Sequence, residues 1–140
     1  DVLRSAYTDA SIDPRTVDYV EAHGTGTILG DPIEADALGR VVGRGRNADK
    51  PMLLGSVKTN YGHMESAAGA GAIAKVVLAL RNGVIPASRN YSGPNPYIQF
   101  DETHLKVIPE TTEWPPLLGS RHRRHLRLRL RRHQRPRRRA

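Results

Sequence analysis

Two short polar stretches of the sequence carry the side chains that could do chemistry. In the first, VEAHGTGT, a histidine is followed by alternating glycine and threonine. The hydroxyls of Thr25 and Thr27 are able to hydrogen-bond a polar ligand, while the intervening glycines permit a close approach of the backbone. A single histidine such as His23 is more often a structural residue than a catalytic one, so a function for it depends on a second group of reactive side chains.

The second stretch, SVKTNYGHMES, supplies a lysine and a histidine five residues apart, Lys58 and His63. His63 precedes a predicted helix, and the dipole at a helix N-terminus disfavours the charged imidazolium. A neutral imidazole can donate an N–H to a developing oxyanion without losing its proton, so the pattern favours electrostatic stabilisation of negative charge. The histidines lack the HExxH spacing of a zinc site and the chain has no cysteine, so we expect no metal.

The first stretch lies between a predicted strand and a predicted helix. Alternating hydrophobic residues predict a strand over 17–22. After the loop, a capping box predicts a helix that ends at a glycine near residue 43. Its members are Asp31 as N-cap, Pro32 at the first helical position and Glu34 at the third. His23 is therefore expected at the carboxyl end of a strand.

The second stretch has the same surroundings. A hydrophobic run predicts a buried strand over 51–58, and a run of small residues predicts a helix over 66–81 that ends at Gly83 and approaches another backbone closely. The remaining expectations are a helix over 1–10, a turn over 11–17, no helix over 83–100 and a short strand over 104–111. Alternating strands and helices predict an α/β fold, in which ligands bind at the carboxyl ends of the strands.

Charge divides the chain into two parts. Residues 1–118 carry a net charge of −3, whereas residues 119–140 contain eleven arginines and no acidic residue. We therefore expect a domain over 1–116 and a separate Arg-rich tail over 117–140. The first residue is not methionine and no signal peptide is recognisable, which indicates the interior of a longer chain. The longest apolar run is too short to span a membrane and contains Lys75.

The two stretches in their wider context, VEAHGTGTILGDPIEADAL and LLGSVKTNYGHMESAAGAGAIAKVVLAL, resemble the C-terminal half of a β-ketoacyl synthase. More narrowly, residues 1–115 resemble the ketosynthase domain of a type I modular polyketide synthase. The resemblance implies a thiolase-like α/β fold with α/β/α/β/α layers, incomplete in this chain. It also implies decarboxylative Claisen condensation, in which an acyl group is held on a cysteine and attacked by the enolate of a malonyl-type extender.

The resemblance also implies roles for particular residues. The catalytic positions of the family are matched by His23, His63 and Lys58. The positions that contact the pantetheine arm are matched by Thr25, Thr27 and Asn60. The structural or supporting positions are matched by Asp31, Glu34 and Glu65. No cofactor is expected on the chain itself, because the phosphopantetheine arm is carried by the acyl carrier protein.

The same resemblance implies the partners. They are the acyl carrier protein, acyl and malonyl-type thioesters and, for the complete domain, a second copy in a homodimer. Neither a membrane nor a nucleic acid is expected as a partner, and the family implies a cytoplasmic location.

Two features depart from the family. The nucleophilic cysteine is absent, so the chain alone is expected to be inactive, and a decarboxylase-like relative without that cysteine is an alternative. The tail replaces a glycine-rich strand of the family. High-GC codons for GISAFGFGGTNAHVV, read from their third base, encode HLRLRLRRHQRPRR, which is the sequence of residues 125–138. We therefore predict a frameshifted, disordered tail; the alternative is an arginine-rich segment that binds nucleic acid.

Overall fold

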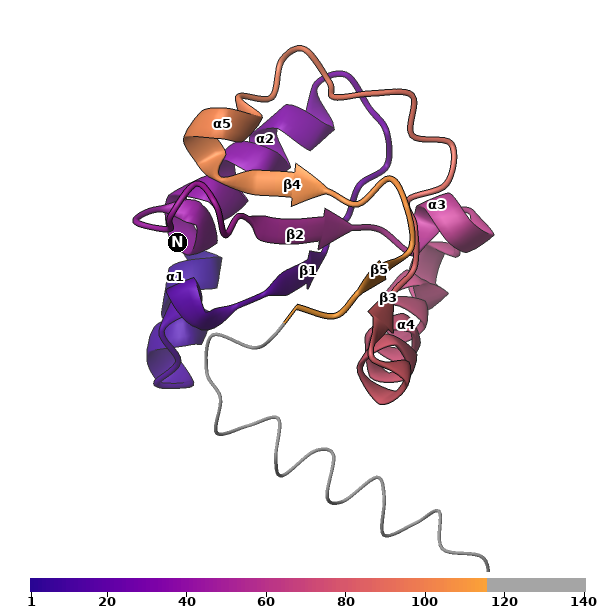
Figure 1. Ribbon diagram of the computed structural model, residues 1–140, viewed down its shortest axis with the longest axis horizontal. Helices are drawn as coiled ribbons and strands as arrows, with labels where there is room; N and C mark the ends of the chain where they lie inside the picture. Colours follow the sequence, from indigo (N-terminus) through magenta and orange to yellow (C-terminus); the bar gives the residue numbers. More distant parts are fainter. Residues whose placement is uncertain (116–140) are drawn as a thin grey trace, which may run out of the picture.

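The computed structural model of the chain describes residues 1–115. Its centre is a three-stranded parallel sheet in the order β1-β2-β4 (Figure 1). The strands are β1 (Tyr19–Glu21), β2 (Met52–Gly55) and β4 (Leu105–Val107). A separate antiparallel pair consists of β3 (Val84–Ile85) and β5 (Thr112–Glu113). The α/β class predicted from the alternation of strands and helices is confirmed.

Helices connect the parallel strands, as parallel pairing requires. The chain enters through α1 (Val2–Asp9) and the 3₁₀ turn η1 (Pro14–Thr16). Between β1 and β2 lie α2 (Gly30–Leu38) and a π-helical turn, η2 (Gly39–Gly43). Between β2 and β4 lie the helices α3 (Lys58–Tyr61), η3 (Glu65–Ala67), α4 (Ala68–Asn82) and α5 (Phe100–Thr103).

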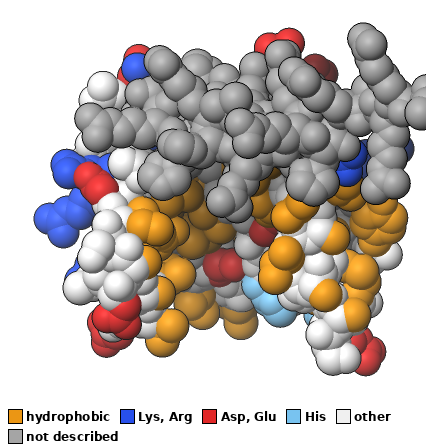
Figure 2. Space-filling view, turned by 90° about the horizontal axis from the view of Figure 1, so that it is seen from below, with side chains coloured by type: hydrophobic (Ala, Val, Ile, Leu, Met, Phe, Trp, Pro, Cys, Tyr) orange, Lys and Arg blue, Asp and Glu red, His pale blue; other side chains and the backbone are white. Residues whose placement is uncertain are grey.

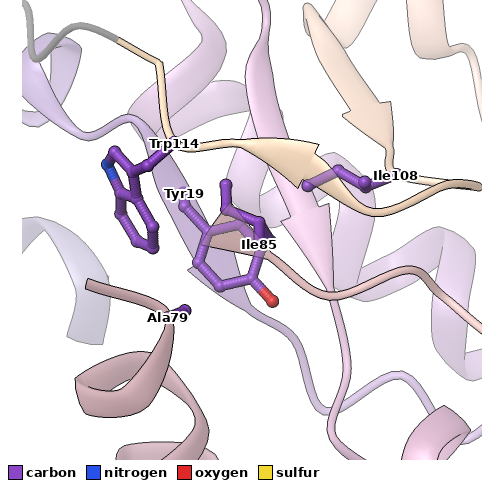
Figure 3. Packing of buried hydrophobic residues seen from close by; sticks show 5 residues of the cluster. All are labelled: Tyr19, Ala79, Ile85, Ile108 and Trp114. Carbon is purple, nitrogen blue, oxygen red and sulfur yellow. The ribbon is translucent and has the colours of Figure 1, made fainter. Parts of the chain in front are cut away.

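Hydrophobic side chains form a separate cluster on each face of the sheet. The first cluster lies between the sheet and α4 and consists of Tyr19, Ala79, Ile85, Ile108 and Trp114 (Figure 3). The second lies between the sheet and the α2–η2 segment and consists of Ala35, Leu38, Val42, Met52 and Leu105. Successive residues of a strand point to opposite faces, so helices cover this small sheet on both sides.

Most of the predicted elements are confirmed. The helix predicted over 66–81 is present as η3 and α4, and it ends as predicted at Gly83, which has a left-handed φ of 72°. The strands predicted over 17–22, 51–58 and 104–111 are present as β1, β2 and β4, each shorter than expected. The polar loop predicted after β2 contains the four-residue helix α3, which the sequence pattern did not indicate.

The start of α2 differs from the prediction. The helix begins at Gly30, so Asp31 lies in its first turn and is not the N-cap. The hydroxyl oxygen of Thr27 instead accepts the Gly30 N–H at 3.1 Å. Glu34 does not complete a capping box, because its carboxylate accepts hydrogen bonds from the loop that carries His23. Glu34, which the sequence pattern placed in a helix cap, therefore supports the loop that carries His23 instead.

Three further expectations concern packing, the membrane and the tail. The predicted close approach of α4 to another backbone is not found at its two glycines: a Cβ on Gly69 would have no atom within 4 Å, and one on Gly71 would meet the side chain of Met64. In the same part of the chain, no helix has the length and apolarity needed to cross a membrane. The predictions for 117–140, including the frameshift, disorder and nucleic-acid binding, lie outside the described residues.

Candidate active site

The two reactive stretches meet at one edge of the parallel sheet. His23 follows the last residue of β1 by two positions, and Lys58 follows the end of β2 by three. Because β1 and β2 are parallel neighbours, their carboxyl ends share this edge. The imidazole rings of His23 and His63 lie edge to face, with centroids 6.1 Å apart. The structure therefore brings together the two histidines that the sequence placed 40 residues apart.

The backbone of the first loop is held by a carboxylate from α2. Glu34 accepts the N–H of His23 at 2.6 Å and the N–H of Gly24 at 3.0 Å, one on each oxygen. Gly24 has a φ of +46°, and a Cβ there would lie 2.9 Å from Cβ of Ser56. A side chain at this position would be strained and crowded, so glycine is what allows the two loops to approach.

The ammonium group of Lys58 holds the same peptide from its other side. Its Nζ donates to the carbonyl oxygen of His23 at 2.7 Å, and Oγ of Ser56 lies 3.5 Å from that oxygen. Lys58 therefore fixes the first loop from the second and places a positive charge beside His23. The peptide that follows β1 is fixed from both α2 and the second loop.

The local backbone defines the tautomer of His63. Its Nδ1 accepts the N–H of Glu65 at 2.9 Å, and an accepting nitrogen bears no proton. In the neutral ring the proton is therefore on Nε2, which is the nitrogen able to donate to a ligand. Glu65 has a φ of +46°, a left-handed conformation that turns its N–H back toward the ring. Glu65 thus contributes through its backbone.

A cavity of about 830 Å³ opens beside His63, whereas His23 is not among its lining residues. Its walls come from both loops, from α2 and from the segment 88–98. Among the residues that the sequence singled out, Thr25, Lys58, His63, Asp31 and Glu34 line it. The cavity is large enough to hold a small-molecule ligand or the end of a carrier arm.

Two further candidates, Thr27 and Asn60, lie outside the wall of the cavity. Thr27 caps α2 through its hydroxyl oxygen. The side-chain amide of Asn60 donates to the carbonyl oxygen of Ala87 at 3.0 Å, which fastens the second loop to the segment that forms the far wall of the cavity. Neither residue lines the cavity, so contact of Thr27 and Asn60 with a pantetheine arm remains a prediction. Among residues 1–115, no group of three or more metal-ligating side chains is gathered.

A buried charged network lies behind the loops and was not among the residues predicted from the sequence. Lys75 of α4 forms an ion pair with Glu21 of β1, at 2.6 Å between Nζ and Oε1. The hydroxyl of Tyr19 also donates to Glu21, and burial, followed by this hydrogen bond, raises the pKa of Tyr19 well above its usual value. A lysine inside an otherwise small and apolar helix was the available signal, because a buried lysine requires a partner.

The sequence matches a known family over most of the described part. Residues 1–92 match the family model described as "Beta-ketoacyl synthase, C-terminal domain". Over 114 residues the chain is 58% identical to a component of the phenolphthiocerol/phthiocerol polyketide synthase of Mycobacterium tuberculosis; the match covers 81% of this chain and 6% of that relative. The highly reducing polyketide synthase poxF of Penicillium oxalicum is 47% identical over 119 residues, which are 84% of this chain and 5% of the relative.

Solved structures agree with this assignment. The ketosynthase from module 1 of the bacillaene synthase of Bacillus amyloliquefaciens FZB42 superposes with a TM-score of 0.73 at 43% identity, covering 80% of this chain and 21% of that chain. Ketosynthase twelve of the bacillaene polyketide synthase in Bacillus amyloliquefaciens gives 0.74 at 40% identity, with coverages of 82% and 20%.

The chain thus spans about one-fifth of these solved chains and about one-twentieth of the curated relatives. The predicted thiolase-like ketosynthase fold is confirmed, and the chain belongs to the β-ketoacyl synthase family, as part of the C-terminal domain of a polyketide synthase ketosynthase.

Proposed function

We propose that residues 1–115 provide the histidine pair of a ketosynthase that condenses an acyl thioester with a malonyl-type extender. The observation that carries this proposal is the contact between His23 and His63 at one edge of the sheet, with ring centroids 6.1 Å apart. In the proposed setting the domain belongs to a cytoplasmic polyketide synthase, forms a homodimer and receives the extender from an acyl carrier protein.

The histidines stabilise the charge that develops during decarboxylation. When the extender loses CO₂, the electron pair of the broken C–C bond is delocalised onto the thioester oxygen as an enolate. The Nε2–H of His63 donates to this oxygen, and His23 beside it supplies the second polar ring. The enolate carbon then attacks the carbonyl carbon of the acyl thioester, and the cysteine sulfur leaves as a thiolate.

The surrounding residues keep this arrangement in place. Lys58 and Glu34 hold the carbonyl and the N–H of His23, so the ring is carried on a fixed peptide. Thr25 lines the cavity, where its hydroxyl is available to the polar pantetheine arm. Placing groups in advance lowers the barrier, because little reorganisation is needed when the charge forms.

We further propose that the nucleophile comes from residues outside this sequence. The 140 residues contain no cysteine, and the covalent acyl intermediate of the proposed reaction requires one. The chain alone is therefore expected to form no condensation product. Activity is expected only when residues 1–115 are part of a longer ketosynthase.

The test uses a hybrid ketosynthase, in which residues 1–115 replace the matching segment of the ketosynthase from module 1 of the bacillaene synthase. The hybrid is expected to release CO₂ from a malonyl-loaded carrier protein and to form the condensation product. His63→Ala removes the Nε2–H donor and is expected to lower both rates by about 10²- to 10³-fold. Released CO₂ and product are measured on the same sample.

A second histidine provides the matched control. His104 lies beside the amino end of β2, opposite the site, where its carbonyl accepts the N–H of Met52. Its φ is 51°, a conformation that asparagine tolerates, so His104→Asn should leave both rates unchanged. Near-normal product from a folded His63→Ala hybrid would contradict the role of His63. A folded dimeric hybrid without any activity would contradict the proposed function as a whole.

A further inference from the structure

The buried ion pair of Glu21 and Lys75 has no part in the catalysis proposed above. The side chains of Glu21 and Lys75 are only 7% and 6% exposed, and their charged atoms lie 2.6 Å apart. Burying two charges costs several kcal/mol per ion, and a well-packed apolar pair of similar volume often gives equal or better stability. Stability alone therefore does not account for this buried ion pair, and the contacts that it makes indicate another role.

Both carboxylate oxygens of Glu21 are used, and they reach different elements. Oε1 binds the ammonium group of Lys75 in α4 and accepts the hydroxyl of Tyr19. Oε2 accepts the backbone N–H of Val57 at 2.7 Å. Val57 directly precedes α3 and is itself 2% exposed. One side chain of β1 thus contacts the residue at the start of the second loop and the helix that follows that loop.

These contacts bracket the segment that carries the second half of the site. Lys58 and His63 lie between Val57, which binds one oxygen of Glu21, and Lys75, which binds the other. Glu21 itself is the last residue of β1 and precedes His23 by two residues. A shift of Glu21 relative to Val57 would therefore change the separation of the two histidine rings.

We propose that Glu21 is a positioning residue that sets His63 opposite His23 by holding the N–H of Val57, with Lys75 as the counter-ion that keeps its carboxylate in place. Glu21 touches no reacting atom in this role; it acts through the start of the second loop. The inference rests on the proposed condensation for its catalytic consequence, whereas the positioning itself is a statement about the fold.

Two double variants of the hybrid ketosynthase separate positioning from charge and packing. Glu21→Gln with Lys75→Met removes both charges but keeps a carbonyl oxygen for the Val57 N–H. Glu21→Leu with Lys75→Met removes both charges and that acceptor as well. Neither variant leaves a lone buried charge, so both should fold. The two variants differ in the hydrogen bond to Val57 and in a polar partner for the hydroxyl of Tyr19, and Val57→Pro removes the first of these alone.

Kinetics give the first readout. The Gln/Met variant is expected to keep kcat within about threefold of the hybrid. The Leu/Met variant is expected to lose about 10²-fold in kcat, since small displacements of catalytic groups have effects of that size, with little change in KM for the malonyl-loaded carrier protein. A purely structural role would affect both variants alike.

Amide hydrogen exchange gives a second readout that needs no activity. The amide of Val57 and those of the following helix α3 are expected to exchange about tenfold faster or more in the Leu/Met variant, and as in the parent in the Gln/Met variant. If the Leu/Met variant does not fold, Val57→Pro removes the same N–H while keeping the ion pair. Its φ of −60° is one that proline adopts, and the same loss of kcat is expected.

The outcomes distinguish this inference from the proposed function. A folded Leu/Met variant with unchanged exchange and kcat would overturn the positioning role, and so would equal losses in both double variants, which would assign the effect to charge. If the unsubstituted hybrid makes no product while exchange follows the expected pattern, the proposed function fails and Glu21 still positions the second loop.

Discussion

Tyr19 connects the hydrophobic cluster under α4 with the charged network behind the site. Its ring packs edge to face against that of Trp114, with centroids 5.6 Å apart (Figure 3). Its hydroxyl donates to Glu21. Burial and this hydrogen bond raise the pKa of Tyr19, so the folded state keeps the phenol protonated at about pH 10, where the unfolded chain ionises. The stability that Tyr19 contributes is therefore fully present below about pH 10 and is lost as the pH rises further.

Substitution of Tyr19 tests this loss of stability at high pH. In the hybrid ketosynthase, Tyr19→Phe should lower the melting temperature at neutral pH, because the hydrogen bond to Glu21 is lost. The difference from the parent should narrow as the pH rises above about 10, since only the parent pays the cost of keeping Tyr19 protonated. Tyr97→Phe, at a residue 68% exposed, is the matched control and should leave the pH dependence unchanged. A constant difference across this range would show that Tyr19 ionises freely in the fold.

At the residue scale, the sequence predicted which side chains gather but not which atoms they use. His23, Lys58 and His63 could be placed together because parallel strands end at the same edge of a sheet. That Lys58 binds the carbonyl oxygen of His23 could not be predicted, since a backbone acceptor is available at every residue. Glu21 and Lys75 become recognisable as a pair only when the faces of β1 and α4 are known.

At the element scale, long helices were predictable and short or competing ones were not. The helix α4 has a long run of small and apolar residues and a glycine at its end. The strands β3 and β5 have two residues each and depend on pairing across 26 intervening residues, which no local pattern encodes. The capping box at α2 failed for a different reason, because the loop amides of His23 and Gly24 compete for the carboxylate of Glu34.

The contact between η2 and α5 depends on a glycine. A Cβ on Gly43 would overlap the carbonyl oxygen of Thr103, and a backbone atom cannot move aside as a side chain can. Gly43→Ala in the hybrid should therefore destabilise the fold by about 1–3 kcal/mol or more. Arg44→Ala, at the next and exposed residue, should stay within about 0.5 kcal/mol. Equal melting temperatures for both variants would mean that η2 and α5 do not touch in solution.

At the scale of the whole molecule, α4 is covered on one side only. Lys75 and Ala79 are buried, whereas Ile73, Val77 and Leu78 are 69%, 55% and 55% exposed. Ile73 and Val77 are four residues apart and share one face of the helix. Hydrophobic side chains also extend over the part of the molecular face that is visible in Figure 2. The solved ketosynthases are about five times longer than the matched part, so we expect other residues to cover this face in a complete ketosynthase.

Charged substitutions on the exposed face of α4 should have opposite effects in the isolated chain and in the hybrid. Ile73→Glu with Val77→Lys places an ion pair on the exposed face of α4, so in isolated residues 1–115 it should reduce self-association, measured by light scattering. In the hybrid the same change would bury two charges against the host, and the yield of folded dimer should fall sharply. Val2→Glu, at a residue 84% exposed on α1, is the control and should be tolerated in the hybrid. If the hybrid accepts the charged pair without loss of melting temperature, the exposed face of α4 remains in contact with water in the complete ketosynthase, and its apolar character needs another partner.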